Sequence, residues 1–346
     1  MIKSIGARRV FRLSLTVAIA LSVSYGGGAT LPFIAPLFAF MLGAAPKPPM
    51  GPKGLFGLIL VLFLILSTGL LLIPVLTYYP MTALMLVLLG LFFANYLALN
   101  KGKGAVGTFL TVGITLISAM GLMGHALAMM VISALLLNIA IAVICQWVVY
   151  PLFPEDHLPP AAPPPPPPLQ SSWLALRATL IVFPSYLLVL YNPTAYAPII
   201  MKSVALGQQA TETEAKNAGR ELLGSTCMAG VLAILFWFCL KLAPNLWMYF
   251  LWTLAFSMYF IAKFYAVIES RFTPSFWQNV IVTLFIFIGP AVDDTANGKD
   301  PYKASAVRIG LFIGVTIYAW AMLVFLEWLR KRQEYKKQSS LLLEVG

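Results

Sequence analysis

Lysines inside apolar segments are the side chains of this sequence best suited to bind a charged ligand. Lys202 follows an apolar segment interrupted by proline, and Lys263 stands among aromatic residues at 260–265. An ionised group at membrane depth costs at least about 2.5–3.5 kcal/mol on insertion scales, so each is a functional candidate. An anionic ligand would offset part of that cost, and aromatic rings would pack against its apolar part. For Lys263 the alternative is a side chain that snorkels to the nearer membrane surface.

Two adjacent carboxylates, Asp293 and Asp294, follow Gly289 and Pro290 near the end of another apolar segment. Adjacent carboxylates can hold a proton between them. We therefore treat them as candidates for proton coupling, with Arg308 as a pairing partner. The alternative is a solvated loop, because polar residues follow them directly.

Two short segments interrupted by proline occupy similar places in the two halves of the chain. Their characteristic residues are Pro32, Pro36, Asn192, Pro193 and Pro198. A broken helix leaves backbone groups unpaired, which is tolerated only inside protein or beside a water-filled cavity. Such segments in two repeats are the best sequence indication of a transporter's binding site, although re-entrant packing helices are the alternative. We predict that these residues form a substrate site with Lys202 and Lys263.

Other chemistry has no support in the sequence. The chain lacks the Walker motif, HExxH and GxSxG, so we expect neither an enzyme nor a bound cofactor. The three cysteines, Cys145, Cys227 and Cys239, lie in apolar runs with no CxxC pair and no histidine at ligand spacing. We therefore predict neither a metal site nor disulfides.

The elements that must position these residues follow from composition. The 346 residues are 60% hydrophobic and only 10% charged, whereas a soluble chain is closer to half apolar and a quarter charged. Ordinary soluble enzymes, disulfide scaffolds, fibrous proteins and disordered chains are thereby excluded. Apolar windows occur at 10–27, 30–45, 54–77, 80–99, 105–123, 126–151, 172–191, 194–206, 222–243, 246–267, 274–292 and 305–328. We predict an all-α polytopic membrane protein with about twelve transmembrane helices.

The basic residues predict how these helices are oriented. If the N-terminus is cytoplasmic and the spans alternate, 19 of the 23 lysines and arginines fall on the cytoplasmic side. The positive-inside rule therefore favours twelve spans with both termini in the cytoplasm. A signal peptide within residues 1–28 is less consistent, because no convincing small-residue cleavage site follows.

A proline-rich stretch at 153–171 divides the chain. Its six consecutive prolines, 163–168, favour an extended rod that could return the chain across the cytoplasmic face. A ligand for a proline-reading domain is the alternative. We predict a six-helix repeat at 1–152, this linker, a second six-helix repeat at 172–329 and a basic cytoplasmic tail at 330–346. Because six is even, both repeats enter the membrane from the same side and form a parallel repeat.

Residues 12–21 followed by Leu31-Pro32-Phe33-Ile34-Ala35-Pro36 resemble the fusaric acid resistance and aromatic acid exporter superfamily. The chain is more closely similar to a compact bacterial inner-membrane branch, and plant aluminium-activated malate transporters are distant relatives. The resemblance implies an energised exporter that works with a periplasmic adaptor and an outer-membrane channel. Pro32 and Pro36 are the matching positions. The chain departs from the family because a proline rod replaces the large domain between the halves.

These observations lead to one expectation and two alternatives. We expect an inner-membrane efflux transporter for hydrophobic or aromatic organic anions, driven by the proton gradient. A passive anion channel is the first alternative, and a non-transporting membrane scaffold for an adaptor protein is the second. The expected partners are the lipid bilayer, a small organic anion, the adaptor and the channel. Homo-oligomerisation stays open. Nucleic acid is not an expected partner, because basic loops explain the positive charge.

Overall fold

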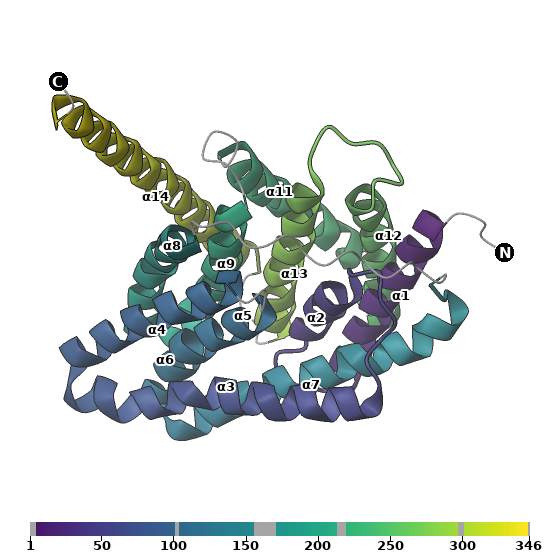
Figure 1. Cartoon of the computed structure of the whole chain (residues 1–346). Coiled ribbons are helices and arrows are strands. Elements are labelled where there is room, and N and C mark those ends of the chain that lie inside the picture. Colours follow the sequence, from purple (N-terminus) through teal and green to yellow (C-terminus); the bar gives the residue numbers. More distant parts are fainter. Residues whose placement is uncertain (1–4, 101–103, 156–170, 213–218, 297–300, 345–346) are drawn as a thin grey trace.

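The chain folds into a bundle of helices, as the computed structural model in Figure 1 shows. The structure describes residues 5–100, 104–155, 171–212, 219–296 and 301–344. No strand occurs in these ranges. The helices confirm the predicted all-α polytopic membrane protein.

The first half of the chain contains the helices that precede the proline-rich stretch. They are α1 (Ile5–Gly26), α2 (Ile34–Gly43), α3 (Pro52–Tyr78), α4 (Pro80–Asn100), α5 (Gly104–Val112), η1 (Gly113–Ile117), α6 (Ser118–Met123), α7 (His125–Val149) and η2 (Tyr150–Leu152). The π-helix η1 joins α5 and α6 into one continuous span, Gly104–Met123.

The second half begins at the end of the proline-rich stretch, of which residues 156–170 lie outside the described ranges. Its helices are α8 (Ser171–Tyr191), α9 (Pro193–Glu212), η3 (Gly219–Leu223), α11 (Gly224–Lys241), α12 (Leu246–Phe264), α13 (Pro274–Ala296) and α14 (Pro301–Glu344). Helix α14 continues through the predicted boundary at residue 330, so the described part of the basic tail extends the last span.

Nine helical spans of the described chain are long and apolar enough to cross a membrane. The other three of the twelve predicted segments form α1, α2 and α9. Helix α1 carries three arginines near its start, α2 has only 10 residues, and α9 ends in polar residues. With 20 residues, α9 is longer than the predicted short segment. These helices contribute many buried residues, so much of their surface contacts protein instead of lipid.

The spans differ in how much protein surrounds them. In α13, 78% of the most apolar window is buried, and in the Gly104–Met123 span 67% is buried. In α3 and α4 the buried shares are only 17% and 22%. The outer helices therefore present apolar side chains to lipid, whereas α13, Gly104–Met123 and α2 form the interior.

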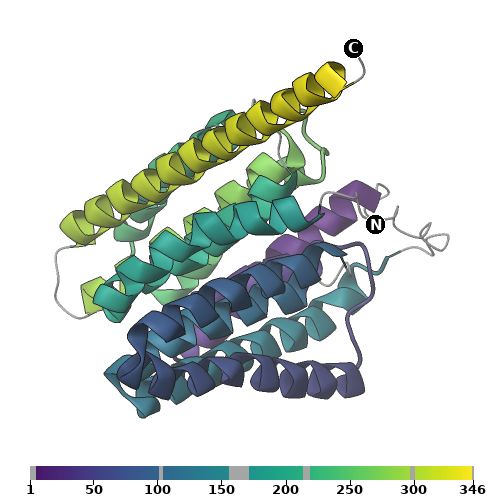
Figure 2. The ribbon, with the colours of Figure 1, turned by 60° about the vertical axis from the view of Figure 1, so that its left-hand side comes forward.

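The helix contacts correspond between the two halves. Helix α1 packs on α2 and α7, and in the same order α8 packs on α9 and α14. The contacts between the halves correspond as well. Helix α1 of the first half packs on α12 of the second half, and α8 of the second half packs on α4 of the first. In the same way, α2 contacts α13, and α9 contacts α5. Figure 2 shows the two halves, purple to blue and teal to yellow, lying against each other. This is the contact pattern expected of a parallel repeat with an axis along the membrane normal.

Two of the predicted prolines lie at the starts of the short helices. Pro36 lies in the first turn of α2, and Pro193 is the first residue of α9. At these positions the missing N–H has no intrahelical acceptor to lose. Before α2 the chain turns at Leu31, whose φ of 53° is left-handed, and the Ser24 hydroxyl donates to the Pro32 carbonyl over 2.8 Å. The turn places α2 against α1.

Candidate functional site

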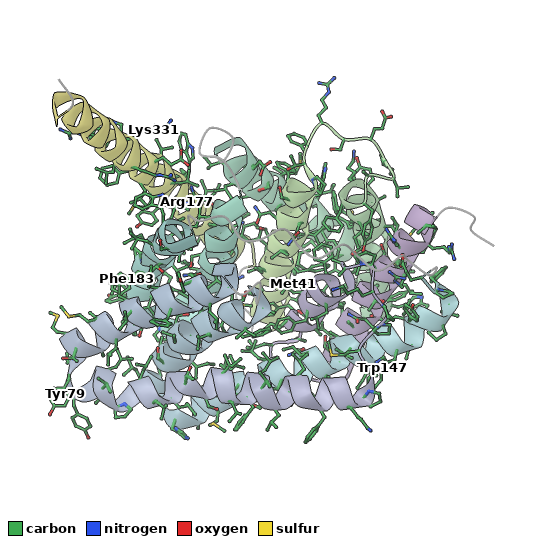
Figure 3. The ribbon with its side chains drawn as sticks, viewed as in Figure 1. Met41, Tyr79, Trp147, Arg177, Phe183 and Lys331 are labelled. Atoms are coloured by element: carbon green, nitrogen blue, oxygen red, sulfur yellow. The ribbon has the colours of Figure 1, made fainter. Side chains whose placement is uncertain are left out.

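A cavity of about 150 Å³ lies at the interface between the two halves of the chain. Its walls come from α2, α5, α7, α9 and α13. Apolar side chains dominate, among them Leu37, Phe38, Phe109, Met201 and Val282. The polar lining groups are Thr108, Gln278 and Asn279. Met41 and Gln278 also line the cavity and are exposed, so they lie at its mouth; Figure 3 labels Met41 on α2.

Lys202 lies beside this cavity and is completely buried. Its Nζ donates to Asn279 Oδ1 over 3.0 Å and to Thr283 Oγ1 over 2.8 Å. Both partners are neutral, and no described carboxylate pairs with the ammonium. Asn279 stands between Lys202 and the cavity, because it contacts the ammonium and also lines the wall. Its Nδ2 donates to Ser225 Oγ on α11, which orients the amide.

Lys263, in the last turn of α12, lies against a different face of α13. Its ammonium is over the rings of Tyr259 and Trp277, at 5.1 and 5.2 Å from the centroids. Trp277 and Asn279 are two residues apart on α13, which is about 200° around the helix. The two lysines that the sequence predicted to share one site are therefore not brought together. The aromatic rings stabilise the Lys263 cation where it is.

Four other predicted binding residues lie at or just before helix starts, and none of these four lines the cavity. Pro32 precedes α2, and Pro36 is buried in the first turn of α2. Asn192 is exposed in the turn between α8 and α9, and Pro193 is buried next to it. The side chain of Pro198 lies outside the described part of the structure. The four described residues position α2 and α9, which do line the cavity, and a direct contact of these residues with substrate stays a prediction.

The predicted proton-coupling residues are placed only in part. The backbone of Asp293 and Asp294 forms the last turns of α13, and their side chains lie outside the described part. Arg308 is half-buried in the second turn of α14. In the described ranges, no three His, Cys, Asp or Glu side chains are grouped closely enough to hold a metal ion.

The sequence analysis missed the polar residues of α13. Asn279 and Thr283 are four residues apart, so they share one face of an otherwise apolar helix. That spacing was a usable signal, but their partner Lys202 lies 77 and 81 residues earlier. Gly289 was also missed. A Cβ at Gly289 would overlap Phe33, and the Tyr25 hydroxyl donates to the Gly289 carbonyl over 3.4 Å, so α13 packs closely on the turn before α2.

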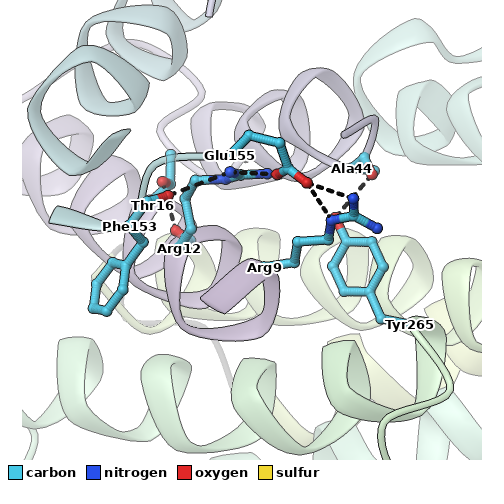
Figure 4. A network of polar contacts seen from close by, with 7 residues as sticks. All are labelled: Arg9, Arg12, Thr16, Ala44, Phe153, Glu155 and Tyr265. Atoms are coloured by element: carbon cyan, nitrogen blue, oxygen red, sulfur yellow. Dashed lines mark hydrogen bonds and ion pairs between the residues drawn. The ribbon is translucent and has the colours of Figure 1, made fainter. Parts of the chain in front are cut away.

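A second polar cluster joins both ends of the first half of the chain (Figure 4). Arg9 Nε donates to Glu155 Oε1 over 2.6 Å, and Arg12 Nη1 is 2.7 Å from Glu155 Oε2. Arg12 also donates to the Phe153 carbonyl over 3.3 Å. Burial alone raises the pKa of Glu155, but the hydrogen bonds and charges of Arg9 and Arg12 outweigh it and hold this pKa below its ordinary value. Glu155 is thus ionised, and its contacts with Arg9 and Arg12 hold the segment after α7 against α1; we call this ion-pair cluster the Glu155 tether.

The second half contains a corresponding pair. Arg177 Nη1 near the start of α8 donates to Glu327 Oε1 on α14 over 3.2 Å. In each half, an arginine of the first helix pairs with a glutamate near the end of the last span, shortly before it for Glu327 and just after it for Glu155. Such a pair ties the two ends of a six-helix unit together.

Comparison with known proteins gives one family model. Residues 9–149 match a model described as a protein of unknown function (DUF2955). The match runs from α1 to the end of α7, which is most of the helical part of the first half. No curated protein and no solved structure matches the chain. The match carries no activity, and the resemblance to the aromatic acid exporters stays a prediction.

Proposed function

We propose that this multi-pass membrane protein is an inner-membrane efflux transporter for hydrophobic or aromatic organic anions. The substrate would bind in the cavity between the two halves. In transporters built from repeats, substrate sites are commonly found at the repeat interface near the middle of the membrane. The observation that carries the proposal is Lys202, a fully buried ammonium whose described partners are neutral, directly behind the cavity wall.

The electrostatic argument favours an anion. A carboxylate bound at Asn279 would lie about two hydrogen-bond lengths, or about 6 Å, from the Lys202 ammonium. At an effective dielectric constant of about 20, two opposite charges at that separation attract by about 3 kcal/mol. The attraction compensates for part of the desolvation of the lysine. A neutral ligand would gain no such compensation.

The walls favour an apolar body of limited size. Leu37, Phe38, Phe109 and Val282 offer aliphatic and aromatic surface. A dry cavity of about 150 Å³ is large enough for benzene. A single-ring aromatic acid therefore fits both the size of the cavity and the charge behind its wall.

Coupling and partners extend the proposal beyond the cavity. The sequence carries no ATPase motif, so an ion gradient would supply the energy, with Asp293, Asp294 and Arg308 as the proposed proton-coupling residues. The resemblance to the aromatic acid exporters supports a periplasmic adaptor and an outer-membrane channel as partners.

Transport by reconstituted protein tests the proposal. In proteoliposomes with an imposed pH gradient, we expect counterflow of labelled benzoate, and we expect Lys202→Met to reduce the rate at least tenfold. Lys263→Met is the matched control, because its ammonium lies away from the cavity, and it should keep the rate within about twofold. Parental transport by Lys202→Met at normal protein density would refute the role of the cavity. Flux without counterflow or pH dependence would instead indicate a channel.

A further inference from the structure

A second cavity, of about 260 Å³, lies inside the first half of the chain. Its walls come from α1, the end of α2, the end of α7 and the loop at 44–51. Two hydrogen bonds hold this loop: Trp147 Nε1 donates to the Met50 carbonyl over 2.6 Å, and the Tyr265 hydroxyl donates to the Ala44 carbonyl over 2.8 Å. These two hydrogen bonds fix the loop in place as one wall of the cavity.

The charged groups on these walls are hydrogen-bond donors, and the amide of Gln146 adds a further donor, its Nε2. Arg12 lines the cavity and is only 6% exposed, and the exposed Lys47 lies at its rim. Gln146 also lines it, and its buried Nε2 has no hydrogen-bond partner in the described part of the chain. A buried donor without an acceptor is destabilising, so its presence calls for an explanation. An acceptor-rich ligand in the cavity would satisfy it.

The charges of this region are unbalanced. Among the described side chains, Arg9, Arg12 and Lys47 contribute three positive charges and Glu155 contributes one negative charge, which leaves these four groups with a net charge of +2. Glu155 also demonstrates that a carboxylate fits against Arg12 (Figure 4). A second anion in the cavity would reduce the remaining charge and accept from the donors.

We propose that the cavity bounded by Arg12, Lys47 and Gln146 is an anion-binding site, separate from the cavity between the two halves, for a carboxylate or phosphate group. Glu155 contacts the same guanidinium and would compete with the ligand for Arg12. A free small anion and the phosphate of a lipid headgroup share this chemistry. The site does not depend on the proposed transport function, because its test measures binding.

Thermal unfolding of the purified full chain in nanodiscs of neutral phosphatidylcholine provides the test. At constant ionic strength, inorganic phosphate or acetate should raise the midpoint relative to chloride, since a ligand of the folded state stabilises it. Gln146→Leu and Lys47→Met should weaken binding at least fivefold. Lys53→Met is the matched control: it removes an exposed lysine six residues away that does not line the cavity, and it should leave the affinity within twofold.

The Glu155→Gln substitution should have the opposite effect and strengthen anion binding. Without the competing carboxylate, phosphate should bind several-fold more tightly. In a second arm, nanodiscs containing phosphatidylglycerol should raise the midpoint without added phosphate if the ligand is a lipid headgroup, and Gln146→Leu should abolish that rise. Stabilisation by free anions and stabilisation by phosphatidylglycerol would each support the site. The proposal is overturned if neither free anions nor phosphatidylglycerol stabilise the protein, if Lys53→Met weakens binding as much as Lys47→Met, or if Glu155→Gln does not tighten it.

Discussion

At the scale of single residues, the protein holds its buried cations in two different ways. Arg12 and Arg177 are each paired with a glutamate, Glu155 and Glu327. Lys202 is held by the amide oxygen of Asn279 and a hydroxyl. Arg177 has a carboxylate partner of its own among its described neighbours, whereas Arg12 shares Glu155 with Arg9 and the Lys202 ammonium has no carboxylate partner there. This difference is why Arg177 is assigned to structure and Lys202 to ligand binding.

The Glu155 tether should depend on pH. Because the pKa of Glu155 is lowered in the folded protein, its stabilisation is fully present above the ordinary value of 4.5 and is lost as the pH falls through the lowered pKa. Each hydrogen bond to a charged group is worth about 1.5–3 kcal/mol, so amide exchange at 150–155 should accelerate at least about tenfold in that range. Hydrogen exchange followed by mass spectrometry measures this. In Glu155→Gln, exchange should already be fast at neutral pH, and an unchanged acid profile in that variant would contradict the assignment.

A carboxylate placed beside Lys202 should separate stability from transport. Asn279→Asp would give the ammonium a charged partner at the position of an existing 3.0 Å hydrogen bond. We expect a thermal midpoint that is unchanged or higher, and benzoate transport reduced at least tenfold, because the internal carboxylate takes the place of the substrate. Thr283→Ser keeps the hydroxyl and serves as the control. Normal transport by Asn279→Asp would show that the Lys202 charge is not used.

At the scale of elements, α3 and η1 approach each other through glycine. A Cβ on Gly69 of α3 would overlap the carbonyl oxygen of Gly113, the first residue of η1. No flexible side chain can move aside there, because the obstructing atom belongs to the backbone. The close approach is therefore possible only with glycine at position 69.

Alanine scanning of the α3 glycines should reveal this contact. Gly69→Ala should lower the free energy of unfolding by about 1–3 kcal/mol, the typical cost of overpacking. Gly57 lies in the same helix, and a Cβ added there would have no atom within 4 Å, so Gly57→Ala should be neutral or stabilising by up to about 1 kcal/mol. Thermal unfolding monitored by size-exclusion chromatography compares the two. Equal midpoints would mean that α3 and η1 do not pack in this way.

At the scale of the whole molecule, the correspondence between the halves explains where the interior lies. Helices α2 and α9 occupy equivalent places, and each packs on a central span of the other half. The cavity between the halves forms where these four elements meet. Among the described residues, only the second half supplies a lysine there, so the two halves match in their contacts but differ in charge.

The orientation of the bundle can be tested at two exposed positions. In a variant without Cys145, Cys227 and Cys239, a cysteine at Tyr191 should react with an impermeant maleimide in whole bacterial cells. A cysteine at Glu269 should react only after permeabilisation, because the positive-inside distribution places its loop in the cytoplasm. Protection of Tyr191→Cys together with labelling of Glu269→Cys would reverse the predicted topology.

The sequence by itself determined the fold class and the order of the helices. An apolar run of about 20 residues in lipid must satisfy its backbone hydrogen bonds internally, and a helix does so without any partner. For that reason the twelve predicted segments correspond to helices in the structure, and Lys202 could be recognised as unusual from its neighbours alone. Both inferences rest on local properties of the chain.

The tertiary structure alone decided which side chains meet. Hydrogen-bond partners depend on how each helix is rotated about its axis and which helices pack together, and residues 77 positions apart carry no local signal of contact. The structure therefore placed Asn279 and Thr283 on Lys202, set Lys263 against another face of α13, and put Pro36 and Pro193 in the first turns of α2 and α9. It also joined Arg12 to Glu155 across the whole first half of the chain, because a charge that is buried by packing must find its partner wherever the packing brings one.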